Sequence, residues 1–264
     1  MVWQRLRQGW SARREAAAVA RRPIPDDLWK RTLVRYPFLR RRSADDQAEL
    51  RRMTSLFLDR KEFDARPGVR LTDDVVVAVA AQACLPVLRL GLARYDGFVG
   101  IVLHPDQVVA RRTLTDDDGV VHEYDEVLSG EAVEGGPVML SWRDVRSAGR
   151  SASDAYNVVI HEFAHVLDMA NGAANGVPLL PSDMRLAEWA GALEADYEAF
   201  VERIDHGEQD TALDPYGAEG IEEFFAVASE AFFVAPQAMK EEHPVLYGVF
   251  VRFYRQDPAE ETSR

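Results

Sequence analysis

The chain has 264 residues, of which 47% are hydrophobic and 28% are charged, and it carries a formal net charge of −13. This composition is typical of a soluble protein with a sizeable core, and the negative charge argues against nucleic acid or an anionic membrane as the main partner. The one cysteine cannot form an internal disulfide, and no apolar segment has the length of a signal peptide core or a membrane span, so we expect a cytoplasmic protein.

The charge is unevenly distributed along the chain. Residues 1–42 contain twelve Lys and Arg against three Asp and Glu, so they carry +9 while the rest carries −22. A solvated helix face is the ordinary explanation for such a basic segment, and contact with an acidic partner is the alternative. We expect a basic, flexible or loosely packed arm over 1–24, a single domain over 25–255 and a tail over 256–264.

Apolar residues recur at helical spacing in the first third of the chain and again after residue 153, whereas the region between reads as strands. Ser153 and Asp154 are the expected caps of one helix, and Leu186 begins the expected apolar face of the next. The sequence predicts helices over 26–39, 44–63, 71–85, 153–172, 184–204, 221–236 and 244–258, and strands over 98–105, 119–133 and 136–142. We therefore expect an α+β fold that is mostly helical, with a small central sheet.

The segment NVVIHEFAHVLDMANG, residues 157–172, places two histidines four residues apart in an apolar helix. This spacing puts His161 and His165 one turn apart on the same face, where both imidazoles can reach one metal ion. Glu162 follows the first histidine and can lean toward a water on that metal, which is the H-E-x-x-H pattern of zinc peptidases. The alternative, two histidines satisfied in the core, leaves Glu162 as a charge without a partner in an apolar helix.

A catalytic zinc site needs a third protein ligand. The metzincin pattern is excluded, because Asp168 rather than glycine stands three residues after His165. Further along, the apolar segment IEEFFAVASEAFF contains Glu222, Glu223 and Glu230, and acids in a buried helix need a counter-charge. Spacing alone does not rank these three glutamates, since one can bind the metal while another steadies a ligand histidine.

Three further residues near the motif each have a functional and a structural interpretation. Tyr216, in the loop DPYGAEG before the acidic helix, can donate a hydrogen bond to the oxyanion of a reacting peptide, although tyrosines in such turns are more often structural. Asp168 and Asn157 can hydrogen-bond the ligand histidines, or they can cap the ends of the helix.

Stretches along most of the chain, residues 25–255, resemble the Mlc titration factor A family of zinc peptidases, whose catalytic domain is similar to that of the lethal factor metallopeptidase. The resemblance implies a zincin-like domain with one Zn²⁺ ion bound by His161, His165 and Glu223, and with Glu162 as general base. The family's tyrosine seven residues before the ligand glutamate is matched by Tyr216. The stretches that carry the resemblance are FLDRKEF, AAQACLPVLRLGLARYDGF, GPVMLSWRDV, NVVIHEFAHVLDMANGAANGVP and EFFAVASEAFF.

Two functions are consistent with these residues. The first is a zinc-dependent peptidase, acting on peptides or proteins, in which Glu162 takes a proton from a zinc-activated water. The second is a regulatory binding protein, because the family it resembles is named for sequestering a transcriptional repressor of sugar uptake. A structural zinc site is disfavoured, since such sites usually close four protein ligands and rely on cysteine.

Overall fold

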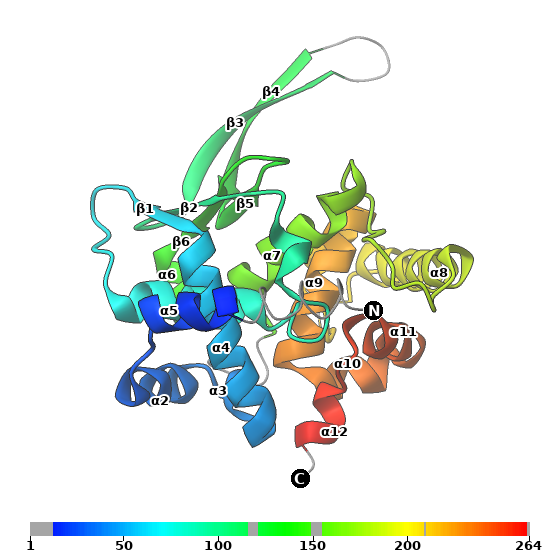
Figure 1. The fold of residues 1–264 in the computed structure, drawn as a ribbon. Helices are drawn as coiled ribbons and strands as arrows, with labels where there is room; N and C mark the ends of the chain where they lie inside the picture. Colours follow the sequence, from blue (N-terminus) through cyan, green and yellow to red (C-terminus); the bar gives the residue numbers. More distant parts are fainter. Residues whose placement is uncertain (1–12, 116–120, 149–154, 209, 263–264) are drawn as a thin grey trace.

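The computed structural model describes residues 13–115, 121–148, 155–208 and 210–262, in which a small sheet lies above most of the helices in the view of Figure 1. The strand order of this sheet is β1-β2-β6-β5. β1, β2 and β6 run parallel, whereas β5 is antiparallel to β6 and forms one edge. Its strands are β1 (Glu62–Ala65), β2 (Gly100–His104), β5 (Gly130–Ala132) and β6 (Val138–Ser141). The predicted α+β class with a small central sheet is confirmed.

Two predicted boundaries in this region are wrong. The helix predicted over 44–63 ends at Arg60, because Lys61 adopts an extended backbone and the next residues form β1. The single strand predicted over 119–133 is two strands, β4 (Val121–Leu128) and β5. β4 pairs antiparallel with β3 (Val108–Thr115), and this hairpin projects from the body of the molecule (Figure 1).

The N-terminal helices form one side of the core. They are α2 (Asp26–Arg35), α3 (Pro37–Arg40), α4 (Ala44–Arg60) and α5 (Asp73–Cys84). The single helix predicted over 26–39 is divided, because Pro37 cannot continue α2 and instead begins α3. α5 is buried nearly all round, as its apolar sequence predicts, and it also buries the amide side chain of Gln82.

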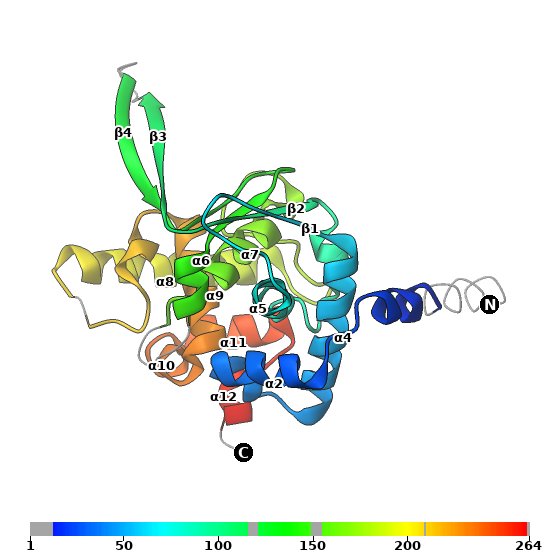
Figure 2. The same ribbon diagram turned by 90° about the vertical axis from the view of Figure 1, so that its left-hand side faces the viewer.

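The described part of the predicted N-terminal arm contains a helix with mostly exposed residues. Residues 13–21 are helical and extend from the side of the molecule beside α4 (Figure 2). Within this helix Ala18 is buried against the core. Two ion pairs attach this helix to α4, from Arg21 to Asp59 at 2.6 Å and from Arg52 to Glu15 at 2.8 Å. The exposed face is basic, which agrees with a solvated helix face. Residues 1–12 of the arm lie outside the described residues.

The C-terminal helices form the other side of the core and hold most of its aromatic residues. They are α7 (Val158–Asp168), α8 (Leu186–Asp205), α9 (Ile221–Val234), α10 (Pro236–Glu242) and α11 (Pro244–Tyr254). The expected apolar face of α8 is shifted, because Leu186 is 60% exposed while Trp189 is fully buried. The Trp189 indole N–H donates to Gly176 O at 2.8 Å, and its ring stacks on Phe250.

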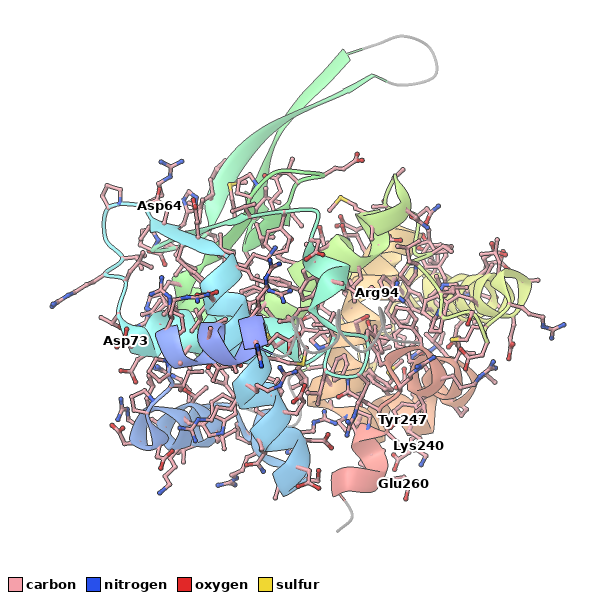
Figure 3. All side chains as sticks on the ribbon, viewed as in Figure 1. Asp64, Asp73, Arg94, Lys240, Tyr247 and Glu260 are labelled. Atoms are coloured by element: carbon pink, nitrogen blue, oxygen red, sulfur yellow. The ribbon has the colours of Figure 1, made fainter. Side chains whose placement is uncertain are left out.

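The predicted C-terminal tail also contains ordered structure. It includes α12 (Pro258–Thr262), and the Ala259 N–H donates to the Tyr247 hydroxyl at 3.0 Å. Lys240 forms an ion pair with Glu260 at 2.8 Å, close to Tyr247 (all three are labelled in Figure 3). Short elements complete the fold: η1 (Leu92–Tyr95), α6 (Trp142–Ser147), η2 (Met169–Asn171) and η3 (Pro215–Ala218). No helix in the described part of the chain combines the length and apolar character that crossing a membrane requires.

Candidate metal centre

The helix that carries the motif, α7, lies beneath β5 and packs against α9 (Figure 1). Its apolar residues face the core, and Asn157 caps its start by accepting a hydrogen bond from Ile160 N–H at 3.0 Å. The helix therefore begins at Val158, later than the sequence predicts. The expected caps Ser153 and Asp154 lie outside the described residues.

The structure brings the two motif histidines together with Glu223 of α9. Nε2 of His161 lies 3.2 Å from Nε2 of His165. Oε2 of Glu223 lies 3.1 Å from the first of these nitrogens and 3.4 Å from the second. Among the described residues, these three side chains form the group of ligand-type atoms that could hold a metal ion.

The three glutamates that spacing could not rank have different positions. Glu223 faces both histidine nitrogens, and its Oε2 is buried without a hydrogen-bond donor. Glu230, two turns further along α9, lies on the other side of the His161 ring, where Oε1 is 2.8 Å from Nδ1. Glu222 lines the cavity outside the three-residue cluster. The packing of α9 on α7 thus places Glu223 where it could bind a metal ion and Glu230 where it supports His161.

Glu230 also fixes the orientation of His161. A carboxylate accepts hydrogen bonds, so Nδ1 of His161 carries a proton, and Nε2 is the ring nitrogen that faces His165 and Glu223. The second oxygen of Glu230 accepts a hydrogen bond from the Asn157 backbone N–H. One buried acid therefore joins the first turn of α7 to the histidine that follows it.

The electrostatics of the cluster are dominated by burial and by the crowding of acids. Burial opposes protonation of His161, but Glu223 and Glu230 outweigh it and hold the pKa of His161 well above its usual range. Burial also disfavours ionised Glu223, yet His161 and His165 hold the pKa of Glu223 well below its usual range. The two acids, Glu223 and Glu230, lie on either side of the His161 ring and favour a positive charge at this site.

Glu162 lies between the histidines and the edge strand β5. It is 5% exposed, and burial raises its pKa to about 7, although His161 and His165 act in the opposite direction. The backbone N–H of Ala132 stabilises its carboxylate. At Gly130, an added Cβ would lie 2.4 Å from Oε1 of Glu162, so only glycine leaves room for this side chain.

Tyr216 reaches the same cavity from η3. Asp214 starts this turn by accepting a hydrogen bond from Tyr216 N–H at 2.9 Å. The phenol ring lies 6.0 Å from the His161 ring, centroid to centroid. Tyr216, His161 and Glu162 together line a cavity of about 170 Å³, which has apolar walls that include Val158.

The remaining sequence candidates have structural roles. Oδ2 of Asp168 accepts hydrogen bonds from the Asn175 and Gly176 backbones at 2.9 and 2.7 Å, and in the described chain it bonds to neither histidine. Asp168 therefore anchors the loop after α7. Asn157 caps the helix and donates from its amide to Gln82 Oε1 at 3.0 Å.

Gly130 and Gln82 are not among the site residues predicted from the sequence. The signal for Gly130 is a glycine inside a strand-like segment, which often marks close approach of another group. The signal for Gln82 is a lone amide in an otherwise apolar helix, which needs a buried hydrogen-bond partner.

Comparisons with known proteins identify the family of the chain. A family model described as glucose-regulated metallo-peptidase M90 matches residues 9–255. Mlc titration factor A of Edwardsiella ictaluri is 39% identical over 224 residues, which cover 84% of this chain and 85% of the relative. Mlc titration factor A of Salmonella arizonae is 37% identical over 237 residues, with 89% and 93% covered. An uncharacterized protein of Synechocystis is 35% identical over 239 residues, with 90% and 86% covered.

These matches extend over most of the chain and include all the residues of the cluster, so they confirm the family resemblance expected from the sequence. The chain therefore belongs to the glucose-regulated metallo-peptidase M90 family and is a homologue of the proteins named Mlc titration factor A.

Proposed function

We propose that the protein is a zinc-dependent peptidase with a zincin-like active-site helix. In this proposal His161, His165 and Glu223 hold one Zn²⁺ ion per chain, Glu162 is the general base and Tyr216 is a second catalytic donor. The observation that carries it is the convergence of three ligand atoms at 3.1, 3.2 and 3.4 Å from one another.

These separations fit the proposed ion. With zinc–ligand bonds of about 2.0–2.1 Å in tetrahedral geometry, two ligand atoms are about 3.3 Å apart. Two imidazole nitrogens and one carboxylate oxygen form a ligand set typical of catalytic zinc, which leaves a fourth position open. The hydrogen bond from His161 to Glu230 supports the proposal further, because ligand histidines usually donate their other N–H to such a partner.

Bound zinc would supply a Lewis acid that polarises the peptide carbonyl and acidifies water. The chain's own residues would then move the protons. Glu162 lines the same cavity as His161, and its carboxylate can accept a proton from the water and return it to the leaving amine. Tyr216 lines the same cavity and can donate its hydroxyl hydrogen to the developing oxyanion. β5 offers an edge strand along which an extended peptide can lie.

The test compares Glu162→Gln with the unaltered protein. We expect the variant to retain about one zinc per chain by elemental analysis and to lose cleavage of a mixed peptide library by at least about 100-fold, the usual scale for general-base loss. Glu194→Gln, on the exposed side of α8, is the matched control and should behave as the unaltered protein. Undiminished cleavage by Glu162→Gln would rule out Glu162 as the base.

A regulatory binding role is the second candidate, and the name of its relatives, Mlc titration factor A, favours it. In this role the protein would sequester a transcriptional repressor, with little or no proteolysis. Glu162→Gln should then still bind that repressor in an equilibrium binding assay. Loss of binding in this variant, with fold and zinc intact, would count against a purely regulatory role.

A further inference from the structure

The outer edge of β5 presents backbone groups toward the metal centre. Ser141 N–H donates to Ser129 O at 2.7 Å across the β5–β6 pair, in which Gly130 lies opposite Leu140. Hydrogen-bonded and non-bonded pairs alternate in an antiparallel ladder, so Gly130 and Ala132 turn their N–H and C=O groups away from β6. Within the described residues no further strand pairs with this edge.

Three cavities follow one another along this edge and along α7. The first is lined by Val158 near the start of α7 and shares His161 with the second, which also reaches His165. The third is lined by Val166 near the end of α7 and by Met169 just beyond it. Met169 lines both the second and the third. The strand and its continuation cross the cavities in the same order, with Leu128–Gly130 at the first, Gly130–Ala132 at the second and Val133–Gly135 at the third.

The third cavity, of about 200 Å³, lies outside the proposed catalytic residues and has mainly apolar walls. Phe98, Val166 and Met169 line it, and they come from separate parts of the chain. Val133 and Leu179 at its rim are 45% and 43% exposed, which is unusual for large apolar side chains. Exposed apolar groups gathered around a cavity mark a binding site more often than a plain surface.

The cavity is also lined by two charged residues, the partly buried Arg94 of η1 (labelled in Figure 3) and the exposed Glu134. The Arg94 guanidinium donates to Leu179 O at 2.5 Å, and in the described chain no carboxylate forms an ion pair with it. Burial, together with the neighbouring Arg255, lowers the pKa of Arg94. Water screens the exposed Glu134 carboxylate more than the partly buried Arg94 guanidinium, so the net effect disfavours a second cation in the cavity and favours an apolar side chain.

We propose that this third cavity is a substrate subsite that binds a large apolar side chain of an extended peptide and excludes Lys and Arg. This inference rests on the proposed peptidase function. The peptide would pair with the outer edge of β5, and the selected residue would lie about two or three residues from the scissile bond, because side chains on one face of a strand recur every second residue. Arg94 and Leu179 determine the selectivity, and neither touches the reacting atoms.

The test uses quenched fluorescent peptides in which one position at a time carries Leu, Ala, Glu or Lys. We expect one of the varied positions to be selective. At that position, kcat/KM should fall about tenfold when Leu is replaced by Ala, which is the scale for a lost apolar contact, and it should fall further when Leu is replaced by Lys. Leu179→Asn should reduce the preference for Leu over Ala, and Arg94→Glu should restore cleavage of the Lys peptide. Val245→Asn, an exposed apolar position on α11, is the control and should leave both ratios unchanged.

Binding of the same peptides to zinc-loaded Glu162→Gln, followed by fluorescence anisotropy, separates the subsite from the chemistry. Weaker Leu-peptide binding after Leu179→Asn supports the subsite even if no peptide is cleaved, in which case the peptidase proposal alone fails. If the peptides are cleaved but neither Leu179→Asn nor Arg94→Glu changes the ratios of kcat/KM between side chains, the subsite proposal is wrong and the peptidase proposal remains. Equal binding of Leu and Lys peptides to Glu162→Gln also overturns the subsite.

Discussion

At the scale of single residues, the position of Glu162 depends on a neighbour that has no side chain. Gly130 of β5 leaves the space that the Glu162 carboxylate occupies, and the Ala132 N–H stabilises its charge. The proposed base is therefore held by the backbone of the strand above it as well as by its own helix. Such contacts decide whether a catalytic carboxylate is oriented for proton transfer.

The variant Gly130→Ala tests this contact. Its methyl group would lie 2.4 Å from Oε1 and 2.6 Å from Cγ of Glu162, so the glutamate must rotate away. We expect kcat to fall by about 10- to 100-fold, part of the contribution of a general base, while zinc content and circular dichroism stay unchanged. Gly100→Ala in β2 is the control, since its new Cβ would meet Pro137 at an ordinary 3.5 Å. An unchanged kcat in Gly130→Ala would contradict the proposed constraint.

At the scale of elements, the pair α7–α9 builds the candidate site. α7 supplies His161 and His165, and α9 supplies Glu223 and, two turns later, Glu230. Glu230 contacts both the His161 ring and the Asn157 backbone. The orientation of His161, a proposed metal ligand, therefore depends on how α9 is positioned along α7. A shift of either helix along the other would separate these groups.

The variant Glu230→Gln tests the connection between the helices. The amide preserves the size of the side chain but removes the negative charge that favours proton donation from Nδ1 of His161. We expect zinc affinity to fall about 10- to 100-fold, as measured by competition with a chromophoric chelator. Glu194→Gln should leave the affinity unchanged. An unaltered dissociation constant for Glu230→Gln would show that this hydrogen bond does not support the ligand.

At the scale of the whole molecule, the candidate site lies where the sheet and the C-terminal helices meet. Ligand residues from α7 and α9 are held against a core to which α5, α8 and α11 also contribute buried side chains. An ion bound by groups from two helices favours the folded chain over the unfolded one. Its binding free energy therefore adds to the stability of the entire domain.

Zinc should accordingly raise the melting temperature, and the rise should grow with the logarithm of the free zinc concentration once this exceeds the dissociation constant. At 100 times the dissociation constant, the expected gain is about 2.7 kcal/mol, which corresponds to roughly 5–10 °C for a chain of this size. Differential scanning calorimetry with buffered zinc and with a chelator measures the shift. His161→Ala should melt at the same temperature in both solutions. A zinc response that persists in this variant would place the ion elsewhere.

The sequence by itself determined the parts of this protein that depend on local spacing. The H-E-x-x-H interval puts His161 and His165 on one helix face regardless of the fold, and most helices follow from their apolar period. Lone strands were less predictable: β1 has only four residues, and its pairing with β2 is set by contacts distant in the chain.

Only the tertiary structure decided the contacts between distant segments. Spacing left Glu222, Glu223 and Glu230 equivalent, and the family resemblance indicated Glu223. The packing of α9 on α7 places Glu223 at the histidine nitrogens and Glu230 on the other side of the His161 ring. The approach of Gly130 to Glu162 and the cavity between Arg94 and Leu179 likewise join segments far apart in sequence. Helical periodicity constrains neighbours within a turn, whereas such distances depend on how complete helices and strands pack.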